Sequence, residues 1–446
     1  MVKRFLVGIA LCAVSLSCVA QMGPLAPTPP MGWNSWDAYG LTIDEAQFRA
    51  NVDVLAKRLK PAGYEYAVVD EGWYLANPTK AKDEAFEYRV DANGRYLPAL
   101  NRFLSAAGEA GFRPVADYVH GLGLKFGIHI IRGIPTKAVE ANAAIEGSAF
   151  HAVDAADVSD TCPWNPDNYG VKDNAAGQAW YDSLMRQYAK WGVDYIKVDC
   201  IASHPYKGNE IRMIHRAIAK TGRPMVLSLS PGPAPLDKAA EVAENAQLWR
   251  ISDDVWDMWV NQKPWPRSVK SQFPVIASWV GTVKPGNWPD ADMLPLGTLG
   301  PSPGDGSPRV TRLTHDEQRT LVTLWAIARS PLIVGTNLTE LDDWTVALLT
   351  NADVVSMDQR GHEQRMAGQD GDLIVWTSKG DGGREYLALF NVGDSAVRVE
   401  TPLRRYGFAA EQYAARDVWE KKDLGKIDET KGTIASHGVL LLELRR

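Results

Sequence analysis

The chain has 446 residues, of which 45% are hydrophobic and 23% charged, an ordinary composition for a globular protein. This length is enough for a large core and predicts two domains. A formal net charge of -6 excludes an overall basic protein of the kind that binds nucleic acids or anionic membranes.

The first twenty residues have the pattern of a signal peptide. Lys3 and Arg4 precede an apolar run at 5–16, and small residues follow up to Ala20. The apolar run is too short to span a membrane. We therefore expect cleavage after Ala20 and a secreted or periplasmic protein. A lipoprotein leader with Cys18 as the lipidated residue is the alternative, although the residues before Cys18 suit it poorly.

Two cysteines, Cys162 and Cys200, remain once this leader is removed. An even pair of cysteines in an oxidising compartment predicts a disulfide between them. Two buried free thiols are the alternative that the sequence leaves open.

Strand-like and helix-like segments alternate from Met31 onward. Strands alternating with helices indicate a parallel sheet, and eight such units predict a (β/α)8 TIM barrel over residues 21–355. A doubly wound open sheet is the alternative, but no glycine-rich phosphate loop follows the first strand. The predicted strands are 31–33, 64–69, 124–131, 193–198, 225–229, 248–251, 292–296 and 331–334, and the predicted helices are 43–59, 103–120, 175–191, 209–221, 238–245 and 315–329.

The pattern changes after about Val355. Short alternating segments punctuated by Gly and Asp predict a C-terminal antiparallel β-sandwich domain over residues 356–446. A stretch rich in Pro, Gly and Ser at 300–308 is expected to form a loop over one end of the barrel. The predicted C-terminal strands are 373–376, 386–391, 397–399, 412–418 and 438–442.

The strand at 193–198 delivers one carboxylate, Asp199, to its carboxyl end. Lys197 faces the same way two residues earlier, and a cation there would keep Asp199 ionised. A surface ion pair is the simpler interpretation of two such residues alone. However, chemistry in these barrels takes place where strands end, and acidic residues and tryptophans recur there. They are Trp36 and Asp37 after the first strand, Asp70 and Glu71 after the second, Arg250, Asp253 and Asp254 after the sixth, and Trp288, Asp290 and Asp292 at the seventh.

A pocket lined with carboxylates and indoles, without a cluster of metal ligands, predicts a carbohydrate substrate and no cofactor. Glycoside hydrolysis needs two carboxyl groups that flank the scissile bond. Asp199 suits the nucleophile, Asp254 can act as the acid/base, and Arg250 can orient a carboxylate or hold a sugar hydroxyl. We expect neither a nucleic acid nor a membrane as a partner.

Several motifs resemble, in order, those of glycoside hydrolase family 27, the α-galactosidase family, over about residues 28–350. They are Pro30–Trp36, Tyr64–Tyr66 leading to Asp70, Tyr195–Asp199, Arg250–Asp254 and Trp288–Met293. The resemblance implies a TIM barrel followed by an antiparallel β-domain, and a retaining double displacement that releases terminal α-D-galactose. It gives Asp199 the role of nucleophile and Asp254 that of acid/base. It also implies that Trp36, Asp70, Lys197, Arg250 and Asp292 hold the terminal sugar.

Four positions depart from the family pattern. Glu71 replaces the usual Asp, and its extra methylene would intrude where the C6 hydroxymethyl group of galactose lies, as in β-L-arabinopyranosidases. Ser230 replaces a Glu that binds the C2 hydroxyl and resembles the α-N-acetylgalactosaminidase variant. His129 replaces a frequent Tyr, and Cys200 lies one residue early. A barrel that binds sugar without cleaving it is the alternative from another class, and the retention of both catalytic carboxyl groups argues against it.

Overall fold

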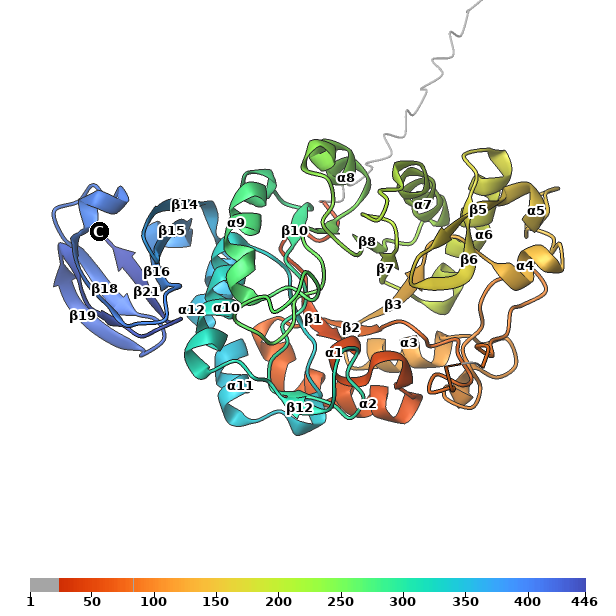
Figure 1. Ribbon diagram of the computed structural model, residues 1–446, viewed down its shortest axis with the longest axis horizontal. Helices are drawn as coiled ribbons and strands as arrows, with labels where there is room; N and C mark the ends of the chain where they lie inside the picture. Colours follow the sequence, from red (N-terminus) through yellow and green to blue (C-terminus); the bar gives the residue numbers. More distant parts are fainter. Residues whose placement is uncertain (1–23, 83) are drawn as a thin grey trace, which may run out of the picture.

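The computed structural model describes residues 24–82 and 84–446. The predicted signal peptide therefore lies outside the described residues. A central barrel carries a C-terminal β-domain (blue) at one end and a small inserted sheet (yellow) at the other (Figure 1). Within the described ranges, no helix is both long enough and apolar enough to cross a membrane.

Eight parallel strands form the barrel sheet in the order β10-β9-β8-β7-β3-β2-β1-β13. Its two end strands are joined through Leu294, which pairs in parallel with Val334 and whose amide donates to the carbonyl of Ile333 at 2.8 Å. The predicted TIM barrel is confirmed, and the open-sheet alternative is wrong. The strands are β1 (Met31–Asn34), β2 (Tyr66–Val69), β3 (Lys125–Ile131), β7 (Tyr195–Asp199), β8 (Val226–Leu229), β9 (Leu248–Arg250), β10 (Trp288–Asp290) and β13 (Leu332–Val334).

The seventh strand was predicted at 292–296, which is wrong, because β10 ends at Asp290. Asp292 has a φ of 92°, in the left-handed region, so an extended strand cannot run through it. This turn directs the Asp292 side chain toward Arg250 on the neighbouring strand.

Some helices around the barrel begin and end at capping residues that can be recognised in the sequence. The N-cap Asn174 accepts from the amide of Gly177, and Gly192 ends α6 in the left-handed conformation. The predicted helix at 103–120 was too long, because the α-helix begins only at Arg113, and Leu104–Ala106 forms a separate short 3-10 helix. The helices are α1 (Trp36–Tyr39), α2 (Glu45–Val54), α3 (Arg113–Gly121), α4 (Thr136–Glu140), α5 (Ala152–Ala155), α6 (Ala175–Trp191), α7 (Gly208–Thr221), α8 (Ala239–Asn245), α9 (Val269–Trp279), α10 (His315–Ala328), α11 (Asp343–Leu349) and α12 (Ala352–Arg360).

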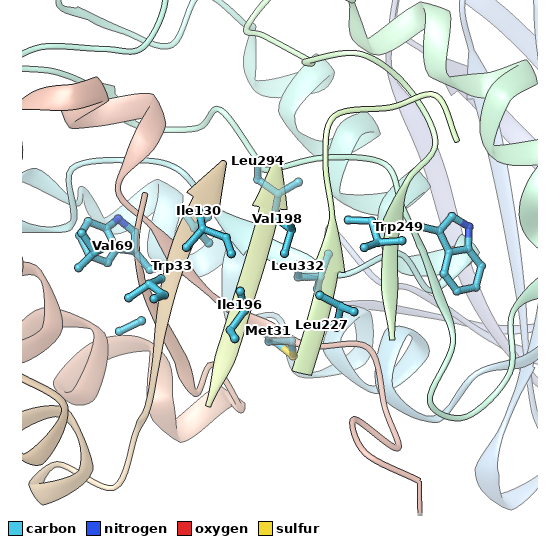
Figure 2. Packing of buried hydrophobic residues seen from close by; sticks show 14 of the residues in the cluster. Met31, Trp33, Val69, Ile130, Ile196, Val198, Leu227, Trp249, Leu294 and Leu332 are labelled. Carbon is cyan, nitrogen blue, oxygen red and sulfur yellow. The ribbon is translucent and has the colours of Figure 1, made fainter. Parts of the chain in front are cut away.

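Alternation along the barrel strands separates the core from the site. Ile196 and Val198 of β7 pack among hydrophobic side chains, whereas Lys197 and Asp199 face the pocket. Figure 2 shows this packing, in which leucine, valine, isoleucine and tryptophan side chains from successive strands lie together. The strand ends are therefore held by a close-packed scaffold.

An inserted antiparallel sheet between β3 and α6 was not predicted. It consists of β4 (Ile134–Pro135), β5 (Ala156–Cys162) and β6 (Asn165–Val171), in the order β4-β6-β5. Cys162 at the end of β5 forms a disulfide with Cys200, with the two Cα atoms 6.0 Å apart. The predicted disulfide is therefore present, and it joins the β5–β6 hairpin to the residue after Asp199.

The segment at 300–308 is a loop, as predicted, and it connects β11 (Thr298–Leu299) to β12 (Arg309–Val310). The amide of Gly304 donates to the carbonyl of Trp36 at 3.1 Å, and that of Ser302 donates to Ala38 at 3.0 Å. The loop therefore lies against the segment after β1.

The C-terminal domain is the predicted antiparallel β-sandwich. His437 joins it to the barrel: one ring nitrogen lies 2.7 Å from a carboxylate oxygen of Glu317, and the ring stacks on Trp259. Most of the residues of β14 and β19 are exposed, so neither strand has the apolar alternation that reveals strands in a sequence. The larger sheet holds β14 (His362–Asp370), β15 (Leu373–Gly380), β16 (Arg384–Asn391), β21 (Val439–Arg445), β18 (Tyr413–Asp417) and β19 (Lys422–Ile427) in that order, while β17 (Val397–Pro402) pairs with β20 (Glu429–Ile434).

Candidate active site

A pocket of about 730 Å³ lies at the carboxyl ends of the barrel strands. Most of the predicted site residues line it, although they come from six different strand ends. The predicted residues in its lining are Trp36, Asp70, Glu71, His129, Lys197, Asp199, Ser230 and Asp254. The other two, Arg250 and Asp292, lie behind Asp254 and contact it directly or through each other.

The carboxylate of Asp199 is held from two sides. Its Oδ2 accepts a hydrogen bond from the hydroxyl of Ser230 at 3.0 Å and lies 3.6 Å from Nε2 of His129. Its Oδ1 accepts from the indole Nε1 of Trp164 at 2.9 Å. Burial raises the pKa of Asp199, but His129, Lys197 and Ser230 outweigh burial and hold the pKa below its ordinary value. Asp199 is therefore kept ionised.

Lys197 is bonded to Asp70 rather than to Asp199. Its Nζ donates to Oδ2 of Asp70 at 2.9 Å, and Nδ2 of Asn34 donates to the same oxygen at 2.6 Å. Despite burial, Lys197 and His129 hold the pKa of Asp70 far below its ordinary value. The charge of Lys197 therefore acts on the pKa of Asp199 only through space, because the hydrogen bond of Lys197 goes to Asp70.

Glu71 extends into the pocket beside Asp70 and is held by the inserted sheet. Its Oε1 accepts from Nδ2 of Asn165, the first residue of β6, at 2.9 Å. Burial raises the pKa of Glu71, and the nearby His129 opposes that effect. Asn165 was missed in the sequence, because no local pattern connects β6 with the end of β2.

Arg250 is shared between two carboxyl groups. Its Nη2 lies 3.2 Å from Oδ1 of Asp254, and its Nη1 lies 2.7 Å from Oδ1 of Asp292. Burial raises the pKa of Asp292 to about 7, with repulsion from Asp254 and Asp290 added and the attraction of Arg250 opposing. The Asp292 side chain is 3% exposed and that of Asp254 is 33% exposed, so Asp254 is the member of this cluster that a ligand can reach.

His129 is buried at the base of the pocket between two carboxylates. Its Nε2 lies 3.6 Å from Asp199 and 4.0 Å from Asp70. Burial lowers the pKa of His129, but the two carboxylates outweigh burial and raise the pKa above its ordinary value. Arg132, three residues later, is not in the pocket lining. Its Nε donates instead to the carbonyl of Cys200 at 2.7 Å and so supports the backbone after Asp199.

The outer part of the pocket is lined by aromatic residues that are not among the predicted site residues. Trp164 and Trp265 are 45% and 44% exposed and lie on different segments. A signal for Trp164 existed: it stands two residues after Cys162, and a bond from Cys162 to Cys200 brings it close to Asp199. Trp265 carries no comparable signal.

Comparisons with known proteins point to one family. The family model for α-galactosidase A matches residues 169–360, and that for the α-galactosidase C-terminal β-sandwich domain matches residues 370–444. α-Galactosidase A of Cellvibrio japonicus is 27% identical over 99% of each chain.

Two solved structures are more similar in sequence. A GH27 β-L-arabinopyranosidase of Geobacillus stearothermophilus is 45% identical, with a TM-score of 0.89, over 95% of this chain and 97% of that chain. A Bacillus halodurans protein named as a candidate α-N-acetylgalactosaminidase is 40% identical, with a TM-score of 0.83, over 95% of this chain and 99% of that chain.

Proposed function

The chain belongs to glycoside hydrolase family 27, the α-galactosidase family, and from that premise we propose that it removes terminal β-L-arabinopyranosyl residues in preference to α-D-galactosyl residues, with retention of configuration. The observation that carries the choice of sugar is the carboxylate of Glu71 in the pocket, held by Asn165 at 2.9 Å.

The proposed reaction is a double displacement. Asp199 attacks the anomeric carbon while Asp254 gives its proton to the leaving oxygen, which forms a covalent glycosyl-Asp199 intermediate. Asp254 then takes a proton from water, which attacks the same carbon and releases the sugar with its configuration kept. The two carboxyl groups in one pocket, one of them held ionised, support this assignment.

The proton needed by the acid fits the charge balance around Arg250. One guanidinium faces the carboxyl groups of Asp254 and Asp292, so two negative charges there would be only partly neutralised. Interacting carboxyl groups bind a proton as a group rather than singly. We propose that Asp254 delivers the proton to the leaving oxygen, because its side chain is 33% exposed and lines the pocket, whereas that of Asp292 is 3% exposed.

The sugar preference follows from the length of Glu71. β-L-Arabinopyranose has the ring and hydroxyl arrangement of α-D-galactose but lacks C6. A carboxylate one methylene longer than the usual Asp occupies the space of the hydroxymethyl group, and Asn165 keeps it there. The 45% identity to a β-L-arabinopyranosidase supports this choice.

α-D-Galactosides are the second, slower class of substrate. The contacts of Lys197 and Asn34 with Asp70 are independent of Glu71, so the groups that bind the other sugar hydroxyls remain in place. The α-galactosidases among the relatives support this. α-N-Acetylgalactosaminides are a third candidate class of substrate, because the short side chain of Ser230 leaves more room at C2 of the sugar than a Glu would.

Release of nitrophenol from β-L-arabinopyranoside, α-D-galactoside and α-N-acetylgalactosaminide substrates tests the proposal on protein without residues 1–20. We expect the arabinopyranoside to have the highest kcat/KM and the α-galactoside to be turned over measurably. An α-galactoside that is turned over equally well would overturn the preference. Binding without turnover of any substrate would favour the non-catalytic alternative.

Glu71→Asp should move the preference toward α-D-galactosides. Removing one methylene makes room for C6, and one methylene group of fit changes discrimination by roughly tenfold or more. The ratio of kcat/KM for the two nitrophenyl glycosides measures the effect. Glu65→Asp is the matched control, since Glu65 precedes β2 at its other end and pairs with Lys125 at 2.6 Å. An unchanged ratio in Glu71→Asp would contradict the role of Glu71.

Gly304→Ala should weaken sugar binding through Trp36. An added Cβ at Gly304 would lie 2.3 Å from the Trp36 indole, so the ring must move. Small displacements of positioning groups can lower kcat/KM by roughly tenfold to a hundredfold. Gly281→Ala is the control, because no heavy atom lies within 4 Å of its added Cβ. Equal kinetics in both variants would show that Trp36 does not position the sugar.

We also propose that the enzyme is exported. The charged start, the apolar run and the small residues before Ala20 support a cleaved leader. The disulfide between Cys162 and Cys200 fits an oxidising compartment.

A further inference from the structure

We propose that Trp164 is a positioning residue for the nucleophile and also one wall of the leaving-group site, and that the disulfide between Cys162 and Cys200 keeps it in place. The proposal rests on the proposed role of Asp199. Trp164 lies at the tip of the β5–β6 hairpin, and its indole Nε1 donates to Oδ1 of Asp199 at 2.9 Å.

The two oxygens of Asp199 are held by different parts of the chain. Oδ2 is held from within the barrel by Ser230, with His129 nearby, whereas Oδ1 is held by the inserted hairpin. Fixing both oxygens sets the rotation of the carboxylate about its Cβ–Cγ bond. Hydrogen bonds to the charged form also stabilise it, which keeps the nucleophile ionised and helps it depart from the sugar in the second step.

The hairpin is tied to the backbone that carries Asp199. Cys200 follows Asp199 directly, and its partner Cys162 precedes Trp164 by two residues, so the disulfide brings the two side chains together. Arg132 adds a second connection. Its Nη2 lies 2.9 Å from Oδ1 of Asp160 on β5, and its Nε donates to the carbonyl of Cys200 at 2.7 Å.

The ring of Trp164 faces the outer part of the pocket, where Trp265 stands on another segment. Both rings are nearly half exposed, and the prolines Pro163 and Pro264 line the pocket beside them. Flat apolar faces of this kind accept an uncharged ring, either a sugar or an aryl group. A leaving group bound there covers Trp164 and shields its hydrogen bond to Asp199 from water, which strengthens that bond.

Trp164→Phe keeps an aromatic wall, although a smaller one, and removes the N–H donor. We expect kcat/KM to fall by roughly tenfold, as for the loss of one hydrogen bond to a charged group. Loss of a hydrogen-bond donor should raise the pKa of Asp199, so that the ionised nucleophile is lost at a higher pH. In a plot of kcat/KM against pH, the fall in rate on the acidic side should therefore move to higher pH. Trp265→Phe makes the same change in the same pocket and should leave the acidic side of the profile in place.

Cys162→Ser in the full chain tests the tether. The acidic side of its pH profile of kcat/KM should move in the same direction. Adding Trp164→Phe to Cys162→Ser should produce no further movement, because both changes remove the same hydrogen bond between Trp164 and Asp199. Circular dichroism and thermal unfolding report whether each variant is folded. Trp164→Phe alone decides the proposal if the cysteine variant fails to fold.

The pKa of Asp199 can also be measured without turnover, by carbon NMR of aspartate-labelled protein with Asp199→Asn used to assign the signal. A higher pKa in Trp164→Phe than in the wild type supports the proposal, and an equal one overturns it. This measurement separates two failures. A wild type that is silent on every glycoside refutes the proposed function, whereas an active wild type with an unmoved Trp164→Phe profile refutes only the role of Trp164.

Discussion

Asp199→Asn should lower turnover of the best substrate by roughly four orders of magnitude or more, as the loss of a nucleophile does in other enzymes with covalent intermediates. The amide cannot form the glycosyl intermediate, yet it has nearly the same shape as the carboxylate. Ser230 can rotate its hydroxyl to accept from the new amide, so the pocket should stay folded. Steady-state kinetics on the fastest nitrophenyl glycoside, with thermal unfolding of the same sample, measures both effects.

Asp194→Asn is the matched control for Asp199→Asn. Asp194 immediately precedes β7, at the strand end opposite Asp199, and pairs with His120 and Arg223 far from the pocket. This variant should unfold at a lower temperature and keep its turnover. Azide added to Asp199→Ala should restore release of nitrophenol and give a glycosyl azide of inverted configuration, because azide attacks once from the vacant side. Wild-type rates in Asp199→Asn would refute the assignment.

Asp254→Ala should affect substrates according to their leaving groups. Loss of a general acid costs roughly a hundredfold to ten-thousandfold. The full loss of rate should be seen with natural sugar leaving groups, because a nitrophenolate can leave without being protonated. The second step also slows, because no base activates water, so the glycosyl-enzyme should accumulate and be visible by mass spectrometry. Azide should then speed turnover and give a product of retained configuration.

Asp253→Ala is the control for Asp254→Ala. Asp253 is the preceding residue and lines the same pocket, but its carboxylate pairs with His204 at 3.0 Å and Arg267 at 3.2 Å. It should show neither the dependence on leaving group nor the response to azide. If Asp253→Ala shows both and Asp254→Ala shows neither, the acid/base is Asp253.

Sequence patterns predicted the elements whose signals are local. The helix α6 was predicted with its observed bounds, since Asn174 caps its start and Gly192 ends it. The helix α9 was missed, because Pro274 lies inside it. The strand β10 contains Pro289, a residue that argues against a strand, and the prediction fell on the residues after it.

The candidate site was predictable where the barrel itself places a side chain. Alternation puts Lys197 and Asp199 on one face of β7, and parallel strands bring Asp70 and His129 to the same end. Which groups then bond to one another depends on distances between strands, so the pairing of Lys197 with Asp70 was not foreseen. The side chains of Trp164 and Asn165 come from an insertion, and no periodic pattern places such a segment over a barrel.

The closure of the barrel through Leu294 has a consequence for motion. Between β10 and β13, pairing passes through Leu294, whose amide and carbonyl bond to Ile333 and Gly335. Elsewhere around the sheet, neighbouring strands share pairs of consecutive residues. The barrel can therefore open locally between β10 and β13 with the least loss of hydrogen bonds. Asp292 lies two residues from Leu294 and its Oδ1 lies 2.7 Å from Nη1 of Arg250, so an opening of this seam would also loosen the contact between Asp292 and Arg250.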